Sequence, residues 1–267
     1  MPEVVSNIKE TTDFPNDALE FKQPDLSIVI PAYREEKRIG KSLDELGNYL
    51  RSNQFFQNKN VEVLVISAGT SDETNVIVTS KASQFARLEL HKLDSKVGKG
   101  RDVRYGMLRA SGKFIIFMDA DLATPLHHLE EFYKHCQHEN EIVIGTRNLH
   151  TYRANAIRRA VSIAGNVLFK LSGNVWIEDS QCGFKMFSEK AAKLCFTRLE
   201  NMGWGFDMEI LVIAKANELR IKTLRIDDWK DMPGSTFTDG FIITSIRSLK
   251  DLAFIVKNRL SGKYIAG

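Results

Sequence analysis

The stretch K-F-I-I-F-M-D-A-D-L-A-T-P, residues 113–125, decides the fold expected of this chain. Its apolar run, residues 114–118, ends abruptly at two carboxylates, Asp119 and Asp121, which are separated only by Ala120. A run of this length is typical of a strand buried on both faces, although periodicity alone also allows a buried helix. As a strand, it places both acids just beyond its carboxyl end, where open α/β sheets bind ligands.

The spacing of these two acids indicates what they bind. On an extended backbone, residues 119 and 121 point to the same side. Two hard oxygen donors close together suit Mg2+ or Mn2+ carrying a diphosphate. The competing interpretation is a turn that caps the next helix, since Asp and Thr favour turns and helix starts.

Apolar runs and amphipathic segments alternate along the chain. The predicted strands cover residues 26–30, 61–66, 88–91, 114–118, 142–144 and 222–226. The predicted helices cover roughly residues 37–52, 72–86, 101–111, 154–172 and 207–218. This alternation predicts an α/β fold with a mostly parallel, Rossmann-like sheet flanked by helices.

The chain divides into three parts. Residues 1–25 are polar and acidic and are expected to form a loosely held arm. Residues 26–240 are expected to form a single domain. Residues 241–267 carry five basic residues and one acidic one, a net +4, whereas the whole chain carries +3. The positive excess therefore belongs to the tail.

The tail is expected to be an amphipathic basic helix. Its apolar residues recur at spacings of four and three, a helical stripe made by Ile242, Ile246, Leu249, Ala253, Val256 and Leu260. Three partners fit such a stripe: the body of the domain, a second copy of the chain in a homodimer, or an anionic membrane surface.

Composition excludes several classes of protein. The chain has 267 residues, 43% of them hydrophobic and 27% charged, which is typical of a globular domain. Its three cysteines are odd in number and far apart, so we expect a reducing compartment rather than a disulfide framework or zinc site. The six histidines, among them His127 and His128, show no ligand spacing, and no metal is assigned to them. No nucleic-acid partner is expected.

The expected location follows from the same features. No basic region followed by an apolar core opens the chain, and no apolar stretch reaches the roughly 18 residues of a membrane span. A cytoplasmic protein is expected, with peripheral contact at the cytoplasmic membrane face through the tail as the open alternative.

Two further groups of residues suit anionic ligands. Residues 96–101, K-V-G-K-G-R, place three cations among two glycines at a predicted helix start, where N–H groups favour phosphate. The alternative is a basic surface turn, since the P-loop spacing is absent. Arg147, Arg158 and Arg159 are arginine forks that suit phosphate oxygens, or else part of a solvated basic face.

Near residue 207 the chain combines acids with aromatic rings. Asp207 and Glu209 lie close to Trp204 and Phe206 in sequence. The rings can form a platform for a sugar face, or they can be core residues beside a helix whose dipole the acids complement.

Six motifs, in this order, resemble the family-2 glycosyltransferases of the GT-A fold, and most of all the dolichyl- or polyprenyl-phosphate glucosyltransferase branch. The motifs are IVIPAYREE, KVGKGRDVRYGM, DADLATP, GTRN, DSQCGFKMF and GWGFDMEIL. The resemblance covers roughly residues 25–240. It implies inverting transfer of a hexose, first of all glucose, from a nucleotide diphosphate sugar such as UDP-glucose to a polyprenyl or dolichyl phosphate.

The resemblance also implies roles for individual residues. The metal ligands would be Asp119 and Asp121 of the DxD motif, with Mg2+ or Mn2+ as the cofactor. The donor would contact Pro31, Ala32, Tyr33, Glu35, Ser67, Lys99, Asp119, Ala120, Asp121 and Gln181. The acceptor would contact Arg147, Arg158, Arg159 and Trp204. Asp121 would serve catalysis through the cation, and Asp207 or Asp179 would take the proton from a hydroxyl acceptor.

One departure from the family pattern leaves other functions open. Ser67 and Ala68 stand where many relatives carry two acids, one of which commonly contacts the nucleobase. The nucleotide is therefore open, with GDP as an alternative to UDP. A soluble metabolite or saccharide acceptor, or a nucleotide-sugar-binding protein without turnover, are the competing functions. A Rossmann oxidoreductase is disfavoured because no GxGxxG follows the first strand.

Overall fold

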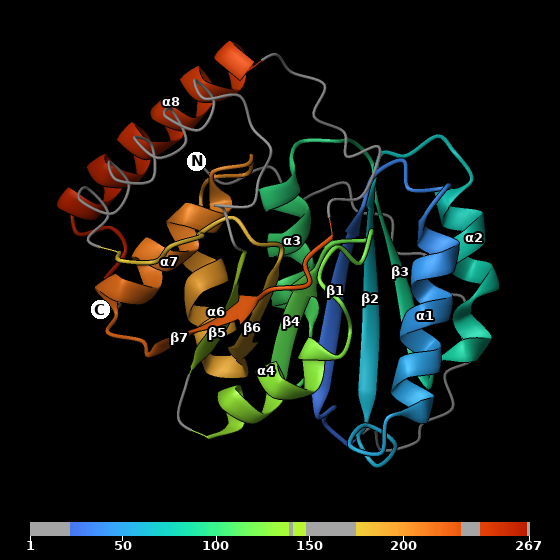
Figure 1. Cartoon of the computed structure of the whole chain (residues 1–267). Helices are drawn as coiled ribbons and strands as arrows, with labels where there is room; N and C mark the ends of the chain where they lie inside the picture. The colour runs from blue at the N-terminus through green and yellow to red at the C-terminus, as the bar shows by residue number, and fades with distance from the viewer. Residues whose placement is uncertain (1–21, 139–140, 148–174, 231–240, 266–267) are drawn as a thin grey trace.

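A sheet with helices on both faces forms the centre of the molecule (Figure 1). The structure is a computed structural model that describes residues 22–138, 141–147, 175–230 and 241–265, with the backbone alone for 241–248. Across these residues, seven strands pair in the order β3-β2-β1-β4-β6-β5-β7. They are β1 (Leu26–Ala32), β2 (Val61–Ala68), β3 (Arg87–Leu93), β4 (Phe114–Met118), β5 (Ile142–Arg147), β6 (Phe184–Ser188) and β7 (Ile221–Ile226).

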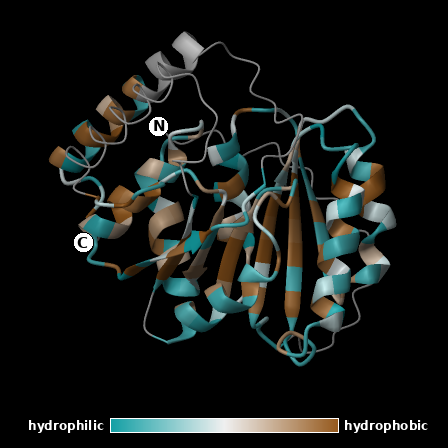
Figure 2. Cartoon of the chain, viewed as in Figure 1, coloured by the Kyte–Doolittle hydropathy of each residue, from teal (hydrophilic) through white to brown (hydrophobic). Residues whose placement is uncertain are grey.

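Strand β4 lies in the middle of the sheet, between parallel β1 and antiparallel β6. Its side chains, and those of β1 and β2, are almost all buried, because helices cover both faces. These central strands are mostly hydrophobic in Figure 2. The strand predicted at 114–118 is therefore confirmed, and so is the mostly parallel sheet.

The helices form two layers. Apolar residues of α1, α2 and α4 join one core cluster, and those of α3, α6, α7 and α8 join the other. The helices are α1 (Ile39–Ser52), α2 (Thr74–Ser80), α3 (Lys99–Arg109), α4 (His128–Gln137), α6 (Glu189–Arg198), α7 (Phe206–Ala216) and α8 (Phe241–Leu260). A short 3-10 helix, Ala82–Gln84, follows α2 and ends the helix predicted over 72–86.

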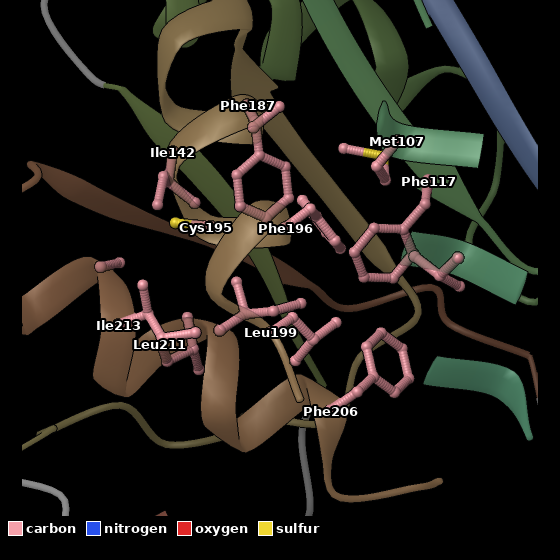
Figure 3. Close-up of a cluster of buried hydrophobic side chains, with 14 of the residues drawn as sticks. Met107, Phe117, Ile142, Phe187, Cys195, Phe196, Leu199, Phe206, Leu211 and Ile213 are labelled. Carbon is pink, nitrogen blue, oxygen red and sulfur yellow. The ribbon is translucent and has the colours of Figure 1, made fainter. Parts of the chain in front are cut away.

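The second core cluster is rich in aromatic rings. Figure 3 shows Phe117 of β4 facing Phe196 of α6 and Phe206 at the start of α7. The ring centroids of Phe117 and Phe206 are 5.7 Å apart. Because Phe206 precedes Asp207, this packing anchors the first turn of α7 against β4, the strand directly before Asp119.

Three elements escape prediction from the sequence pattern: α4, β6 and α6. In β6 a buried lysine, Lys185, interrupts the apolar sequence pattern. Helix α6 follows β6 directly, and the Ser188 hydroxyl caps its start by accepting a hydrogen bond from the Ala191 N–H. The buried side of α4 does carry a helical signal, in Leu129, Phe132, Tyr133 and Cys136. The helix predicted over 154–172 lies outside the described residues.

Helix α8 packs on α7 mainly through residues outside the predicted stripe, although Val256 of the stripe also packs against the core as expected. Leu252, Ile255 and Asn258 are buried, and Tyr264 beyond the helix donates its hydroxyl to buried Glu209 at 2.8 Å. Leu249 and Leu260 of the predicted stripe are 54% and 79% exposed. Packing of the stripe on the body of the domain is therefore wrong for these two residues.

The structure fixes the end of the predicted N-terminal arm and excludes a membrane-spanning helix among the described residues. At the end of the predicted N-terminal arm, the Asp25 N–H donates to the Asn60 carbonyl, and the Asp25 carboxylate pairs with Lys113. Across the described ranges, none of the helices combines the length and the apolar character needed to cross a membrane.

Candidate active site

Parallel strands β1 and β2 end side by side, with Ala32 opposite Ser67, and β4 lies on the other side of β1. Their carboxyl ends therefore share one edge of the sheet. The loop after β1 brings Glu35 to this edge, the loop after β4 brings Asp119 and Asp121, and α3 begins there with Lys99. The predicted site residues of three separate motifs, and Ser67 at the end of β2, thus lie at the same edge of the sheet.

Asp119 is held from two sides. Its carboxylate pairs with the Lys99 ammonium at 2.6 Å, and its N–H donates to the Gly183 carbonyl at 3.2 Å. A Cβ on Gly183 would lie 2.0 Å from an Asp119 carboxylate oxygen. Residue 183 must therefore be glycine for Asp119 to keep this position.

The chain turns between Asp119 and Asp121 instead of staying extended. The expectation that an extended backbone points both carboxylates to the same side is therefore wrong. Strand β4 ends at Met118, Leu122 has a φ of +53°, and its N–H donates to the Asp119 carbonyl. Asp121 accepts the Ala123 N–H at 3.1 Å, an Asx turn. The turn part of the competing interpretation is therefore correct, but the helix-capping part is not, because no side chain caps the start of α4. Burial, and then the nearby charge of Asp119, nevertheless raise the pKa of Asp121.

Glu35 adds a third carboxylate. Burial raises its pKa, and the charges of Asp121 and Asp119 act in the same direction, outweighing its ion pair with Arg38 at 2.8 Å. The Glu35 N–H donates to the Thr74 hydroxyl at 2.9 Å, which fixes the loop after β1 on α2. Arg38 takes part in this site, and the sequence analysis misses it.

These carboxylates fit a hard divalent cation. Asp119, Asp121 and Glu35 repel one another in a partly buried place, and their oxygens are the donors that Mg2+ and Mn2+ prefer. A bound cation would relieve that repulsion, whereas a purely structural turn gains nothing from it. Lys99 is the cation that faces Asp119 in the present structure.

Lys99 lies between Asp119 and a buried ion pair. Burial alone would lower the pKa of Lys99, but the charges of Asp119 and Asp207 outweigh burial and raise it. Asp207 is itself buried and ion-paired with Lys185, which also donates to the Cys182 carbonyl at 2.6 Å. Burial raises the pKa of Asp207 although Lys185 and Lys99 oppose it. The negative charge of Asp207 therefore stabilises the charged form of Lys99 from the buried side of the site. Asp207 itself presents almost no surface to solvent.

The start of α3 is not an open phosphate cradle. The Gly100 N–H donates to the Gly203 carbonyl, and the Arg101 N–H to the Met202 carbonyl. A Cβ on Gly98 would lie 2.2 Å from the Met202 carbonyl oxygen. These glycines allow the loop before α7 to approach, so the expectation that their N–H groups bind phosphate is wrong for residues 100 and 101.

Asp179 and Arg147 form a separate fork. The Arg147 Nε donates to Asp179 Oδ2 at 2.6 Å, and its Nη2 to Oδ1 at 3.0 Å. Burial acts to raise the pKa of Asp179, but these bonds and the Arg147 charge outweigh it and lower that pKa. The Gln181 N–H also donates to Asp179, while the Gln181 side chain is exposed. Asp179 thus orients Arg147 and is poorly suited to take a proton.

The residues predicted to contact the donor and the acceptor differ in burial and in their neighbours. Ser67 is buried, and within the described part of the chain its hydroxyl has no hydrogen-bond partner. The ring of Tyr33 has the Lys96 ammonium 3.5 Å from its centroid, and exposed Trp204 has the Lys99 ammonium at 5.5 Å. Pro31 and Ala32 end β1, and Ala120 is buried. Arg158 and Arg159 lie outside the described residues.

Known proteins resemble this chain in sequence and in fold. Residues 27–196 match glycosyl transferase family 2. The chain belongs to this family.

Similar proteins agree with the family. One dolichyl-phosphate beta-glucosyltransferase of Trichomonas vaginalis is 31% identical over 257 residues, covering 90% of this chain and 78% of that protein. Another from the same organism is 34% identical over 217 residues, covering 79% and 67%. A Mycobacterium tuberculosis glucosyl-3-phosphoglycerate synthase, crystallised with Mn2+, UDP and phosphoglyceric acid, aligns with a TM-score of 0.61 at 17% identity, covering 91% and 80%. The GT-A fold and the glycosyltransferase class expected from the motifs are thereby confirmed.

Two functional residues of this glycosyltransferase, Lys185 and Gly183, are missed by sequence reasoning, and only Lys185 carries a signal in the sequence. Lys185 is a charge inside the otherwise apolar strand F-K-M-F, so it needs a buried partner, and Asp207 is that partner. Gly183 stands directly before that strand, but only the fold shows that its missing side chain makes room for Asp119.

Substituting Gly183 tests the room it leaves for Asp119. We expect Gly183→Ala to lower kcat/KM for sugar transfer by at least about 100-fold, because the new methyl group displaces the carboxylate. The matched control is Gly203→Ala, whose Cβ would meet its nearest atom at 3.4 Å. Steady-state kinetics and circular dichroism of both variants provide the check. Near-normal turnover in folded Gly183→Ala protein would contradict the expectation.

Proposed function

We propose that the protein transfers glucose, or a similar hexose, from UDP to the phosphate of a dolichyl or polyprenyl lipid, with inversion at the anomeric carbon. The observation that carries this proposal is the carboxylate cluster of Glu35, Asp119 and Asp121, placed with Lys99 at one edge of the sheet. The names of the relatives supply the sugar and the acceptor.

The donor end of the reaction uses groups on both sides of β1. Asp119 and Asp121 would hold Mg2+ or Mn2+, which supplies charge neutralisation for a departing diphosphate when bound. Lys99, whose ammonium lies beside the Asp119 carboxylate, would contribute a fixed positive charge near the diphosphate oxygens. The buried Ser67 hydroxyl offers a neutral hydrogen bond to a nucleobase, which would satisfy an otherwise unpaired polar atom.

The acceptor end favours a phosphate over a hydroxyl. In the proposed reaction a phosphate oxygen bonds to the anomeric carbon while the bond from that carbon to the UDP oxygen breaks. The attacking oxygen is already anionic, so no base is needed. The two predicted bases, Asp207 and Asp179, are both buried and ion-paired, which disfavours a hydroxyl acceptor. Arg147 and Trp204 are the described residues proposed to face the acceptor.

A transfer assay with a DxD variant tests the reaction. Purified protein is given UDP-glucose, Mn2+ and a short-chain polyprenyl phosphate, and the lipid-linked sugar is measured. We expect Asp121→Asn to lower the rate at least about 100-fold with the fold preserved, because removal of one anionic ligand weakens the cation site.

The same assay separates the competing functions. GDP-sugars test the donor, and a soluble acceptor pool tests whether the lipid is needed. Donor binding without transfer or donor hydrolysis would instead support a nucleotide-sugar-binding protein. Unchanged turnover in Asp121→Asn would mean that the cation is held elsewhere.

We also propose that the outer face of α8 lies on an anionic membrane surface, where a lipid acceptor would be found. Exposed Leu249 and Leu260 lie on this face, next to exposed Lys250 and Lys257. An apolar stripe beside a basic one suits the boundary between acyl chains and anionic headgroups. This arrangement favours a peripheral location and gives the stripe a partner other than the domain body.

Vesicle binding tests the α8 face. In co-sedimentation with vesicles containing phosphatidylserine, we expect Leu249→Glu combined with Leu260→Glu to weaken binding at least roughly tenfold, through lost apolar burial and added repulsion. The control adds the same two charges on α2, as Val76→Glu and Thr79→Glu. Equal loss in both variants would contradict a role for this face, and a dimer measured by light scattering that dissociates only in the α8 variant would assign the face to a second copy.

A further inference from the structure

Two histidines and an aspartate converge outside the active site, where the start of α4 meets the end of β7. The Nε2 of His128, the first residue of α4, lies 2.7 Å from Asp228 Oδ1. The Nε2 of the preceding residue, His127, lies 3.3 Å from Asp228 Oδ2. One ligand atom from each of the three residues lies within 4.8 Å of the other two.

The ion pairs with Asp228 leave one buried nitrogen of this cluster without a hydrogen-bond partner among the described residues. The Nδ1 of His128 is buried and, among the described residues, has no hydrogen-bond partner. The Glu131 carboxylate lies 3.8 Å from it, slightly beyond hydrogen-bond distance. Histidines that bind a metal through one nitrogen usually donate the other N–H to a carboxylate. A small movement of Glu131 would therefore complete a carboxylate–histidine–metal arrangement.

The donor set favours a transition metal over Mg2+. Imidazole nitrogens suit Zn2+ and its neighbours in the first transition row, whereas Mg2+ prefers oxygen donors alone. In a tetrahedral zinc site, with bonds of about 2.0–2.1 Å, ligand atoms lie ~3.3 Å apart. The side chains of His127 and Asp228 are 62% and 47% exposed, so they are free to make the adjustment. An open hollow lined by His127, Glu130, Glu131, Lys134 and His135 adjoins the cluster at His127.

We propose that His127, His128 and Asp228 form a zinc-class metal site that clamps the start of α4 to the segment after β7. The clamp would act on the active-site loop, because the Lys230 N–H, two residues after Asp228, donates to the Ala123 carbonyl at 2.9 Å. Ala123 in turn donates its N–H to Asp121. The site is separate from the cation site of the transfer reaction and differs from it in donor chemistry.

Metal binding by the full, untagged chain tests this site. Calorimetry with Zn2+ is expected to give one strong equivalent in wild-type protein. We expect His127→Ala and Asp228→Asn each to weaken Zn2+ affinity at least about tenfold. His138→Ala, which removes an exposed histidine at the end of α4, is the matched control and should bind Zn2+ normally. Bound Co2+ should show visible absorption bands typical of tetrahedral coordination, and Asp228→Asn should lose them.

The two metal sites are distinguished by one more variant. Asp121→Asn should retain the zinc equivalent while losing sugar transfer. Thermal melting without metal checks that each variant is folded. The proposal is overturned if wild-type protein binds no zinc equivalent, if His127→Ala and Asp228→Asn bind Zn2+ as wild type does, or if the zinc equivalent is lost in Asp121→Asn.

Discussion

The charge pair between Lys99 and Asp119 is the interaction on which the active site depends. Strand β4, buried on both faces, brings Asp119 to the edge of the sheet, and α3 brings Lys99 to meet it at 2.6 Å. Bringing a carboxylate and an ammonium out of water is costly unless they are paired. Asp207, on α7, adds a second negative charge near Lys99 and so further stabilises the charged form of that lysine. Three elements far apart in sequence are thereby held in one arrangement.

An excess of negative charge follows from this arrangement. Glu35 and Asp121 each have a raised pKa, caused first by burial and then by neighbouring carboxylates. Folding alone would favour fewer acids here, since like charges in a partly buried place destabilise one another. In the proposed function, a divalent cation carrying a diphosphate would turn that cost into binding free energy. The same repulsion is what the proposed binding of a nucleotide sugar with its cation would relieve.

Local sequence patterns predict much of the sheet and the position of the two acids, because apolar runs and turn residues report burial directly. Elements with mixed patterns, such as β6 with Lys185, are missed because their polar residues find partners only in the folded chain. The extended geometry expected at Asp119 and Asp121 is wrong because the chain turns at Ala120 and Asp121, where the Leu122 N–H donates to the Asp119 carbonyl. Contacts across the fold, such as Gly183 against Asp119, leave no local signal. His127 and His128 likewise gain meaning only when β7 brings Asp228 beside them.

The most direct test of the account is a crystal structure of the protein with UDP and Mn2+, analysed by anomalous scattering from manganese. The account predicts a manganese peak in contact with Asp121, near Asp119, and bridging to the diphosphate, with the Lys99 ammonium close to the same oxygens. A nucleotide bound in another cleft, with no manganese at the carboxyl end of β4, would contradict it.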